Sequence, residues 1–157
     1  MPHDLNIVLV EPEIPMNTGT IGRLCLATGA TLHLIEPFGF EINDSKLKRA
    51  GLDYWQFVKV AIYPDLDNFF KQIPPDAPKI FFSTKGKRDF YEHAFKKNSY
   101  LFFGSETRGL PSSLIQSNQT ITYRIPQYDD RVRSINLANA VGIAAYEAIR
   151  QLGYKDL

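Results

Sequence analysis

Asn17 and Arg23 are the first residues along the chain whose types and spacing suit chemistry on a charged group. They lie in the segment 11–23, which follows a short apolar run and also holds Gly19. A helix that begins at Asn17 would present free N–H groups and the positive end of its dipole to a phosphate or carboxylate. Arg23 lies about two turns further on and would face the same ligand at the start of the helix. A capped helix with a surface arginine also explains this segment by itself.

The segment 104–111 is a second candidate, because it is a turn with unusual polar content after a fully apolar run. Gly104 would let a ligand approach the backbone closely. Glu106 and Arg108 form a Glu-x-Arg pair that a simple strand-to-helix turn does not require. The basic, glycine-containing segment 83–88 would suit a phosphate, although a solvated turn explains it as well.

A fourth polar segment, residues 133–139, leads into the clearest helical pattern of the chain. Ser134 suits the N-cap of that helix. Asn136 and Asn139 are poor helix formers, and their place in its first turns indicates polar contacts beyond capping. Capping alone remains an open interpretation.

The polar segments lie between apolar runs whose period alternates between that of strands and that of helices. The expected strands are residues 5–10, 31–35, 59–63, 79–84, 99–103 and 120–125, and the expected helices are 17–28, 43 or 44 to 51, 65–72, 111–116 and 136–152. Such alternation favours an α/β fold with a mostly parallel sheet covered by helices on both faces. Ligands bind outside the carboxyl ends of the strands in such sheets, so we expect the polar segments to form one site there.

The composition indicates a single domain, residues 1–157, with enough apolar residues (44%) for a core. The net charge of +1 does not by itself indicate a nucleic-acid-binding protein. No apolar stretch reaches the roughly 18 residues of a membrane span, and the first strand begins too early to leave room for a signal peptide. Cys25 is the only cysteine, which excludes an internal disulfide and favours the cytoplasm.

Basic residues form local clusters beside the polar segments. These clusters are Lys46, Lys48 and Arg49; Lys85, Lys87, Arg88, Lys96 and Lys97; and Arg131 with Arg133. Each is explained by a solvated face, but their position in loops next to the candidate site favours an RNA substrate. The histidines, His3, His33 and His93, lack the spacing of metal ligands, so no metal is expected and His33 is expected to be structural. The glycine-rich signatures of phosphate and dinucleotide binding are absent from the sequence.

Taken in order, the segments resemble a known three-part signature. It consists of Asn17-x-Gly19-x-x-x-Arg23 after the first strand, residues 104–109 after a late strand, and residues 125–126 and 134–139 before the last helix. It is similar to that of the SPOUT class of RNA methyltransferases, in its ribose 2′-O-methylating branch. The similarity is closest to the single-domain type that acts on cytidine or uridine 34 of tRNA, and it covers essentially the whole chain. Ser105 stands where the class has proline, and the loop 130–133 departs from the serine-rich form.

The resemblance implies a trefoil knot in the C-terminal part of the fold and S-adenosylmethionine as the methyl donor. The cofactor pocket would be formed by Phe82, Gly104 and Ile125 with their loops, and by Ser134. The class works as a homodimer with the site near the subunit boundary. The last helix, including Tyr146, is therefore expected at that boundary.

The resemblance also implies methyl transfer to the ribose 2′-hydroxyl of the wobble nucleotide in the tRNA anticodon loop. We expect Arg23 to hold a phosphate and stabilise the developing alkoxide, because guanidinium does not deprotonate in proteins. Asn17 would position Arg23 or the ribose, and Glu106 would orient the groups around them. Asn136 and Ser134 would complete the site. Three alternatives remain. One is another RNA target. A non-catalytic RNA-binding module is disfavoured by the intact Arg23 and Asn136, and a small-molecule enzyme is disfavoured by the missing phosphate-binding signatures.

Overall fold

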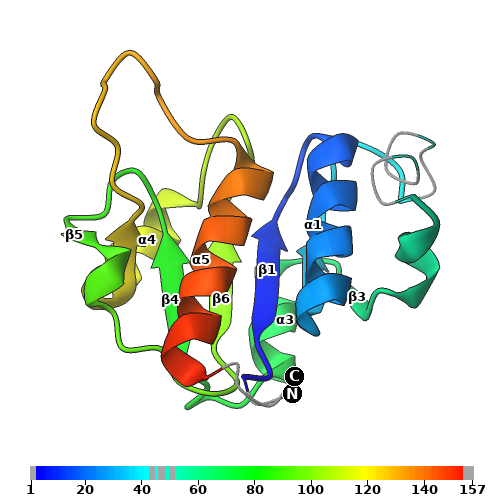
Figure 1. The fold of residues 1–157 in the computed structure, drawn as a ribbon, viewed down its shortest axis with the longest axis horizontal. Helices are drawn as coiled ribbons and strands as arrows, with labels where there is room; N and C mark the ends of the chain where they lie inside the picture. The colour runs from blue at the N-terminus through cyan, green and yellow to red at the C-terminus, as the bar shows by residue number, and fades with distance from the viewer. Residues whose placement is uncertain (1–2, 43–44, 46–48, 50–51, 154–157) are drawn as a thin grey trace.

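The computed structural model describes residues 3–42, 45, 49 and 52–153 (Figure 1). Within these residues a seven-stranded sheet has the order β3-β2-β1-β6-β4-β7-β5, and every strand pair is parallel. The strands are β1 (Asn6–Val10), β2 (Thr31–Ile35), β3 (Val60–Tyr63), β4 (Lys79–Phe82), β5 (Arg88–Asp89), β6 (Tyr100–Phe103) and β7 (Thr122–Arg124). The prediction of a mostly parallel sheet is confirmed, and β5 is a short edge strand that the apolar pattern does not reveal.

Helices cover both faces of the sheet, as predicted. They are α1 (Pro15–Thr28), α3 (Leu66–Gln72), α4 (Ser112–Ser117) and α5 (Leu137–Leu152), with short 3₁₀ segments η1 (Leu52–Phe57), η2 (Phe90–Glu92) and η3 (Gln119–Ile121). Figure 1 shows α1 and α5 side by side on one face, with their N-terminal ends at the edge to which the arrowheads of β1 and β4 point. The α3 and α4 helices pack on the opposite face. The positive ends of two helix dipoles therefore meet the carboxyl edge of the sheet.

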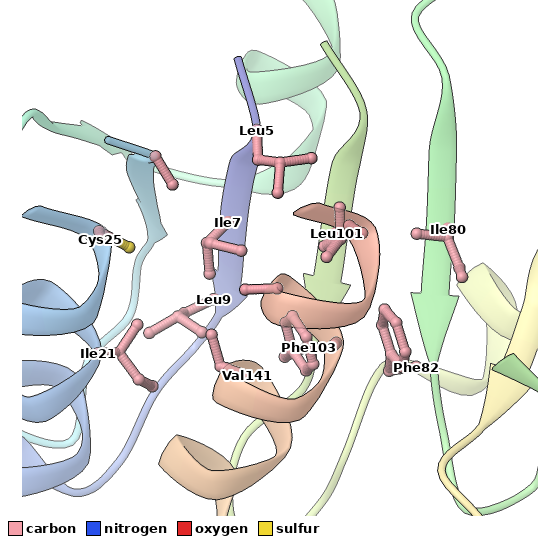
Figure 2. Packing of buried hydrophobic residues seen from close by; sticks show 14 of the residues in the cluster. Leu5, Ile7, Leu9, Ile21, Cys25, Ile80, Phe82, Leu101, Phe103 and Val141 are labelled. Atoms are coloured by element: carbon pink, nitrogen blue, oxygen red, sulfur yellow. The ribbon is translucent and has the colours of Figure 1, made fainter. Parts of the chain in front are cut away.

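Alternate residues of the central strands supply the two cores. Ile7 and Leu9 of β1 pack under α1 and α5, next to Val141, as Figure 2 shows. Val8 and Val10 point to the other face and join the cluster under α3 and α4. Burial of each such side chain contributes about 1.5–3 kcal/mol, so both layers are held firmly against the sheet.

The helix boundaries differ from the sequence prediction at two functionally important ends. The α1 helix begins at Pro15 and not at Asn17, because proline is pre-set for the first helical position and Ile14 takes the N-cap. The N-cap of α5 is Asn136, whose side chain accepts a hydrogen bond from the Asn139 N–H, and not Ser134. Gly29 ends α1 in the left-handed conformation (φ 77°), one residue after the predicted end of the helix at residue 28.

Several expectations concern other parts of the chain. The helix expected from residue 43 or 44 to 51, and the lysines at 46 and 48, lie outside the described residues. Among the described residues, no helix is long and apolar enough to cross a membrane. In the same residues, no group of three or more His, Cys, Asp or Glu side chains could hold a metal ion.

Candidate active site

The loops after β1, β4, β6 and β7 meet at the carboxyl edge of the sheet and line one cavity of about 490 Å³. All of the predicted site residues except Arg23 line it, namely Asn17, Phe82, Gly104, Glu106, Ile125, Ser134 and Asn136. These residues come from distant parts of the sequence, and the parallel sheet brings them together because its strands end at a common edge. The convergence of the segments is as expected, while the role of each residue stays a prediction.

Glu106 ties the loop after β6 to the loop after β1. Its Oε2 atom accepts a hydrogen bond from the Glu13 N–H at 2.7 Å, and its Oε1 atom accepts one from the Ile14 N–H at 3.1 Å. The Asn17 side-chain amide also donates to Oε1, at 3.4 Å. Hydrogen bonds to a charged acceptor are stronger than neutral ones, so this carboxylate fixes the backbone just before α1. Both of its oxygens accept hydrogen bonds, as expected if Glu106 orients the groups around it.

Asn17 and Asn136 extend this connection to the start of α5. The Asn136 Nδ2 atom donates to Asn17 Oδ1 at 3.1 Å, and its Oδ1 atom accepts from the Asn139 N–H at 3.1 Å. The polar contact beyond capping that the sequence indicated is therefore present for Asn136, while Asn139 takes part in the cap through its backbone N–H. We call Glu106, Asn17 and Asn136 the site network; it joins three loops around the cavity.

Glu13 makes a second, reciprocal connection that sequence reasoning missed. Its Oε1 atom accepts from the Thr107 hydroxyl at 2.6 Å and from the Thr107 N–H at 3.3 Å. Hydrogen bonds from the hydroxyl groups of Thr107 and Ser105 lower the pKa of the Glu13 carboxyl below its ordinary value. Glu13 and Glu106 thus each bind the other's loop, and no local pattern could have shown this, because the partners are 94 residues apart.

Gly104 is required by the packing of its own loop. A Cβ atom there would lie 1.9 Å from the Gly109 carbonyl carbon, and Gly109 itself has a φ of +69°. Ser105 and Gly109 form an antiparallel bridge in which the Gly109 N–H donates to the Ser105 carbonyl at 2.9 Å. The space beside Gly104 was expected to admit a ligand, but the loop's backbone fills it. The glycines therefore give this wall of the cavity its tight shape.

The lining of the cavity fits a ligand with an apolar ring and a polar, charged part. Phe82, Leu110 and Ile125 supply apolar walls, and Ser105 and Ser134 supply hydroxyl groups. The volume is within the usual range for small-molecule sites, about 300–1,000 Å³. S-adenosylmethionine has these properties, so the residues present fit the cofactor that the sequence predicts.

Arg23 is the predicted residue that the structure places elsewhere. It lies on an exposed stripe of α1, and its guanidinium carbon is 5.2 Å from the centroid of the Tyr54 ring. The cations that line the cavity are Lys85, Arg108 and Arg133. Arg133 donates to the Thr107 carbonyl at 2.5 Å, so it helps to hold the loop after β6. Arg133 had been noted only as part of a basic cluster.

His33 and Cys25 are structural. The two ring nitrogens of His33 lie 3.1 Å from the Tyr63 hydroxyl and 2.9 Å from Asn6 Oδ1. Burial lowers the pKa of His33 to about 4 and raises the pKa of the Cys25 thiol to about 12. His33 is therefore neutral at neutral pH with both nitrogens occupied, as expected for a structural residue, and Cys25 stays a thiol in the core.

The fold has a cavity at the carboxyl edge of its parallel sheet, and the comparisons with known proteins place the chain in a family of methylases. The chain matches the SpoU rRNA Methylase family over residues 4–146 and belongs to that family. It is 46% identical over 154 residues to a tRNA (cytidine(34)-2′-O)-methyltransferase of Burkholderia cenocepacia (strain HI2424), covering 96% of this chain and 97% of the relative. The predicted resemblance to RNA ribose methyltransferases is thus confirmed.

Solved structures show the same similarity. One, described as giving structural insights into the 2-OH methylation of C/U34 on tRNA, is 46% identical with a TM-score of 0.92 and covers 97% of this chain and 98% of that one. An AdoMet-bound rRNA methyltransferase from Sinorhizobium meliloti is 27% identical with a TM-score of 0.85; the match covers 96% of this chain and 57% of that chain.

Proposed function

We propose that this chain transfers a methyl group from S-adenosylmethionine to the ribose 2′-hydroxyl of the wobble nucleotide, C or U at position 34, of tRNA. The observation that carries the proposal is the convergence of the predicted site residues on one cavity. It is supported by the 46% identity to a C34-methylating relative over nearly the full length of both chains. The short anticodon loop suits such an enzyme, because a single-stranded loop can turn one nucleotide out of its stack.

The cofactor would lie against Phe82 and Ile125, with the loop of Gly104 and Ser134 around it. When bound, S-adenosylmethionine supplies a methyl group on a positively charged sulfur, which is a good leaving group. The residues of this chain then have to align the ribose oxygen with that group and exclude water. The site network performs this alignment, because it fixes the distance between the loops that form the walls.

Arg23 would bind the phosphate next to the target ribose and stabilise the alkoxide that develops there. A guanidinium stays charged, so Arg23 would act as an electrostatic group and not as a base. Its exposed position on α1 places it outside its own chain's cavity. A second copy of the chain, packed on this face, would bring Arg23 to a complete site.

The homodimer that this requires would form through α1 and α5. Their exposed stripes carry the apolar side chains of Met16 (59% exposed), Ile143 (38%) and Tyr146 (55%). Burial of these groups against a second copy would be favourable, and the neighbouring Ala27 would allow close approach. Light scattering should show a dimer at micromolar concentration, and Tyr146→Glu should weaken it.

The C-terminal trefoil knot and the cytoplasmic location belong to the same proposal. A knot is supported by the packing at Gly86, where a Cβ atom would lie 2.5 Å from the Tyr123 carbonyl carbon. The chain after β4 thus passes directly against the backbone of β7. A cytoplasmic location follows from the tRNA substrate.

Methylation of tRNA from cells that lack the protein tests the function. With a radiolabelled methyl donor, the protein should add one 2′-O-methyl group, which mapping by alkaline cleavage should place at nucleotide 34. Ribosomal RNA is the second candidate substrate, favoured by the similarity to the rRNA methyltransferase from Sinorhizobium meliloti. Transfer to rRNA alone would support that candidate, and cofactor binding without transfer to any RNA would leave a non-catalytic binding module.

A further inference from the structure

The loop between β7 and α5 (residues 125–136) extends beyond the rest of the molecule at the carboxyl edge of the sheet. Figure 1 shows it as the orange segment that rises at the top left before it enters α5. Tyr128 in this loop is 96% exposed, against 64% for Phe57 and 59% for Met16. A large aromatic side chain thus stands almost entirely in solvent beside the candidate active site.

The conformation of the loop does not depend on Tyr128. The Gln127 side chain donates to the Val132 carbonyl at 3.0 Å across the tip, and Asp129 Oδ1 accepts from the Arg131 N–H at 3.0 Å. Asp129 and Arg131 also form an ion pair at 2.5 Å. At the base, Arg133 anchors the loop to Thr107. These bonds fix the conformation of the loop, and none of them involves the ring of Tyr128.

The loop also forms a wall between two hollows. One side faces the cavity of about 490 Å³, and the other faces a broader, open hollow of about 1040 Å³ that Tyr128 lines. Ile125, Gln127 and Arg133 line both hollows. A planar group that rested on Tyr128 would therefore lie in a hollow that shares these three residues with the candidate active site.

We propose that Tyr128 stacks on a nucleobase of the RNA substrate that neighbours the methylated nucleotide. The inference rests on the proposed function and adds to it the residue that holds the flanking base. Every nucleobase has a π-face, so an exposed aromatic ring binds single-stranded RNA without strict sequence preference. Arg133 in the same hollow supplies positive charge for an adjoining phosphate, whereas Arg124 is paired there with Asp89 at 2.8 Å. Asp129 is paired with Arg131, which reduces its repulsion of phosphate, and Asp130 is a second carboxylate that lines the hollow.

The experiment compares Tyr128→Ala, Tyr128→Phe and Tyr128→Trp with the parent in binding and methylation of a tRNA anticodon stem-loop RNA. Tyr128→Ala should weaken kcat/KM and RNA affinity about 5- to 150-fold, the effect of losing one stacked base. Phenylalanine and tryptophan should keep most of both, and cofactor affinity should not change. Tyr91→Ala, a change at a tyrosine that is 58% exposed and lines none of the described cavities, is the matched control and should behave like the parent.

Two further measurements separate stacking from a merely structural role. The fluorescence of Tyr128→Trp above that of the parent should be quenched when the RNA binds. In a set of stem-loop RNAs with one abasic position each, one RNA should bind wild type and Tyr128→Ala equally, because the base that the ring contacts is then missing.

The outcomes distinguish this inference from the function on which it rests. An active wild type with an equally active Tyr128→Ala overturns the stacking and leaves the function intact. A wild type that binds the RNA without methylating it overturns the proposed function. In that case quenching of the Tyr128→Trp fluorescence by the RNA would support the stacking, and unchanged fluorescence would overturn it. A protein that does not bind the RNA overturns both.

Discussion

Two hydrogen-bonded polar networks of similar composition lie in different regions of this molecule. The site network, Glu106, Asn17 and Asn136, joins three loops at the carboxyl ends of the strands and lines the cavity. The sheet network, Asn6, His33 and Tyr63, joins neighbouring strands in the body of the sheet. His33 packs there against the rings of Phe69 and Tyr100, with centroids 5.5 and 5.6 Å away.

The comparison shows that residue type does not distinguish a candidate active site from a structural polar cluster. Both networks contain an asparagine amide and a titratable side chain, and both satisfy their members' hydrogen bonds. The difference is the position relative to the strand ends. At the carboxyl ends of the strands, the loops leave a cavity beside the polar groups. Around His33, in the middle of β2, the rings of Phe69 and Tyr100 fill the corresponding space.

The largest expected effect comes from a residue outside both networks. Arg23→Ala should lower the rate of single-turnover tRNA methylation roughly a hundred- to thousandfold, because an electrostatic contact to the developing charge contributes about 2.7–4 kcal/mol. Arg23→Lys should restore little of the rate, since a point charge does not replace the planar fork. Cofactor affinity and thermal stability should stay near wild type, because the side chain is exposed. Near-normal turnover in Arg23→Ala would remove Arg23 from the mechanism.

The sheet network should make the stability of the protein depend on pH, because it contains the buried His33. Because burial lowers the pKa of His33 from 6.5 to about 4, the unfolded chain binds a proton between these values that the folded chain does not. Stability is then complete above pH 6.5 and falls by about 3 kcal/mol as the pH drops to 4. The free energy of unfolding, measured by urea at several pH values across this range, should change less steeply with pH in His33→Gln than in wild type. Equal slopes would mean that His33 takes up its proton in the folded protein too.

Glu106→Gln is the complementary change in the site network. The neutral amide has one accepting oxygen, so both backbone N–H groups before α1 lose a charged partner and one of them is left without an acceptor, at a cost of about 2 kcal/mol. We expect roughly 30-fold slower methylation, together with a lower unfolding midpoint because the same bond is lost from the folded protein. Asp65→Asn is the matched control, because Asp65 accepts from the Asn68 N–H at 2.8 Å at the start of α3. Asp65→Asn should cost about 1 kcal/mol of stability and leave methylation unchanged. Slower methylation in Asp65→Asn, or normal methylation in Glu106→Gln, would contradict the assignment of Glu106 to the site network.

The smallest expected effect concerns a hydroxyl that belongs to neither network. Among the described residues, Thr18 Oγ1 is a buried side-chain oxygen without a hydrogen-bond partner. Thr18→Val keeps the shape and removes the unsatisfied group, so it should stabilise the protein by up to about 1 kcal/mol. Thr28→Val should instead destabilise it, because the Thr28 hydroxyl donates to the Leu24 carbonyl at 2.9 Å. Urea unfolding of both variants measures the contrast, and a destabilised Thr18→Val would point to an unseen partner.

Much of the fold followed from the sequence because it depends on local periodicity. The apolar runs of β1 and β6 and the regular pattern of α5 gave the alternation of strands and helices, and the carboxyl-edge rule then gathered the polar loops. Local rules failed where two of them competed. Pro15 displaced the helix start from Asn17, and Asn136 took the cap that Ser134 also suited.

The remaining features depend on contacts that no local pattern contains. The partners of Glu106 before α1 lie 92 and 93 residues away in sequence. The position of Arg23 is set by Tyr54, which lies in a different element, η1. The strand order, with β4 between β6 and β7, is likewise a property of the whole sheet.

Asn136 has a consequence for the time at which the site comes into being. It caps α5 and contacts Asn17, which lies 119 residues earlier in the chain. Contacts over such separations form late, because a long loop must first be closed at an entropic cost. A chain that is still growing on the ribosome therefore has no complete cavity, even when β1, β2 and β3 are already available to pair. The cavity can close only once the residues up to Asn136 have been made, and the proposed site then still needs Arg23 of a second copy.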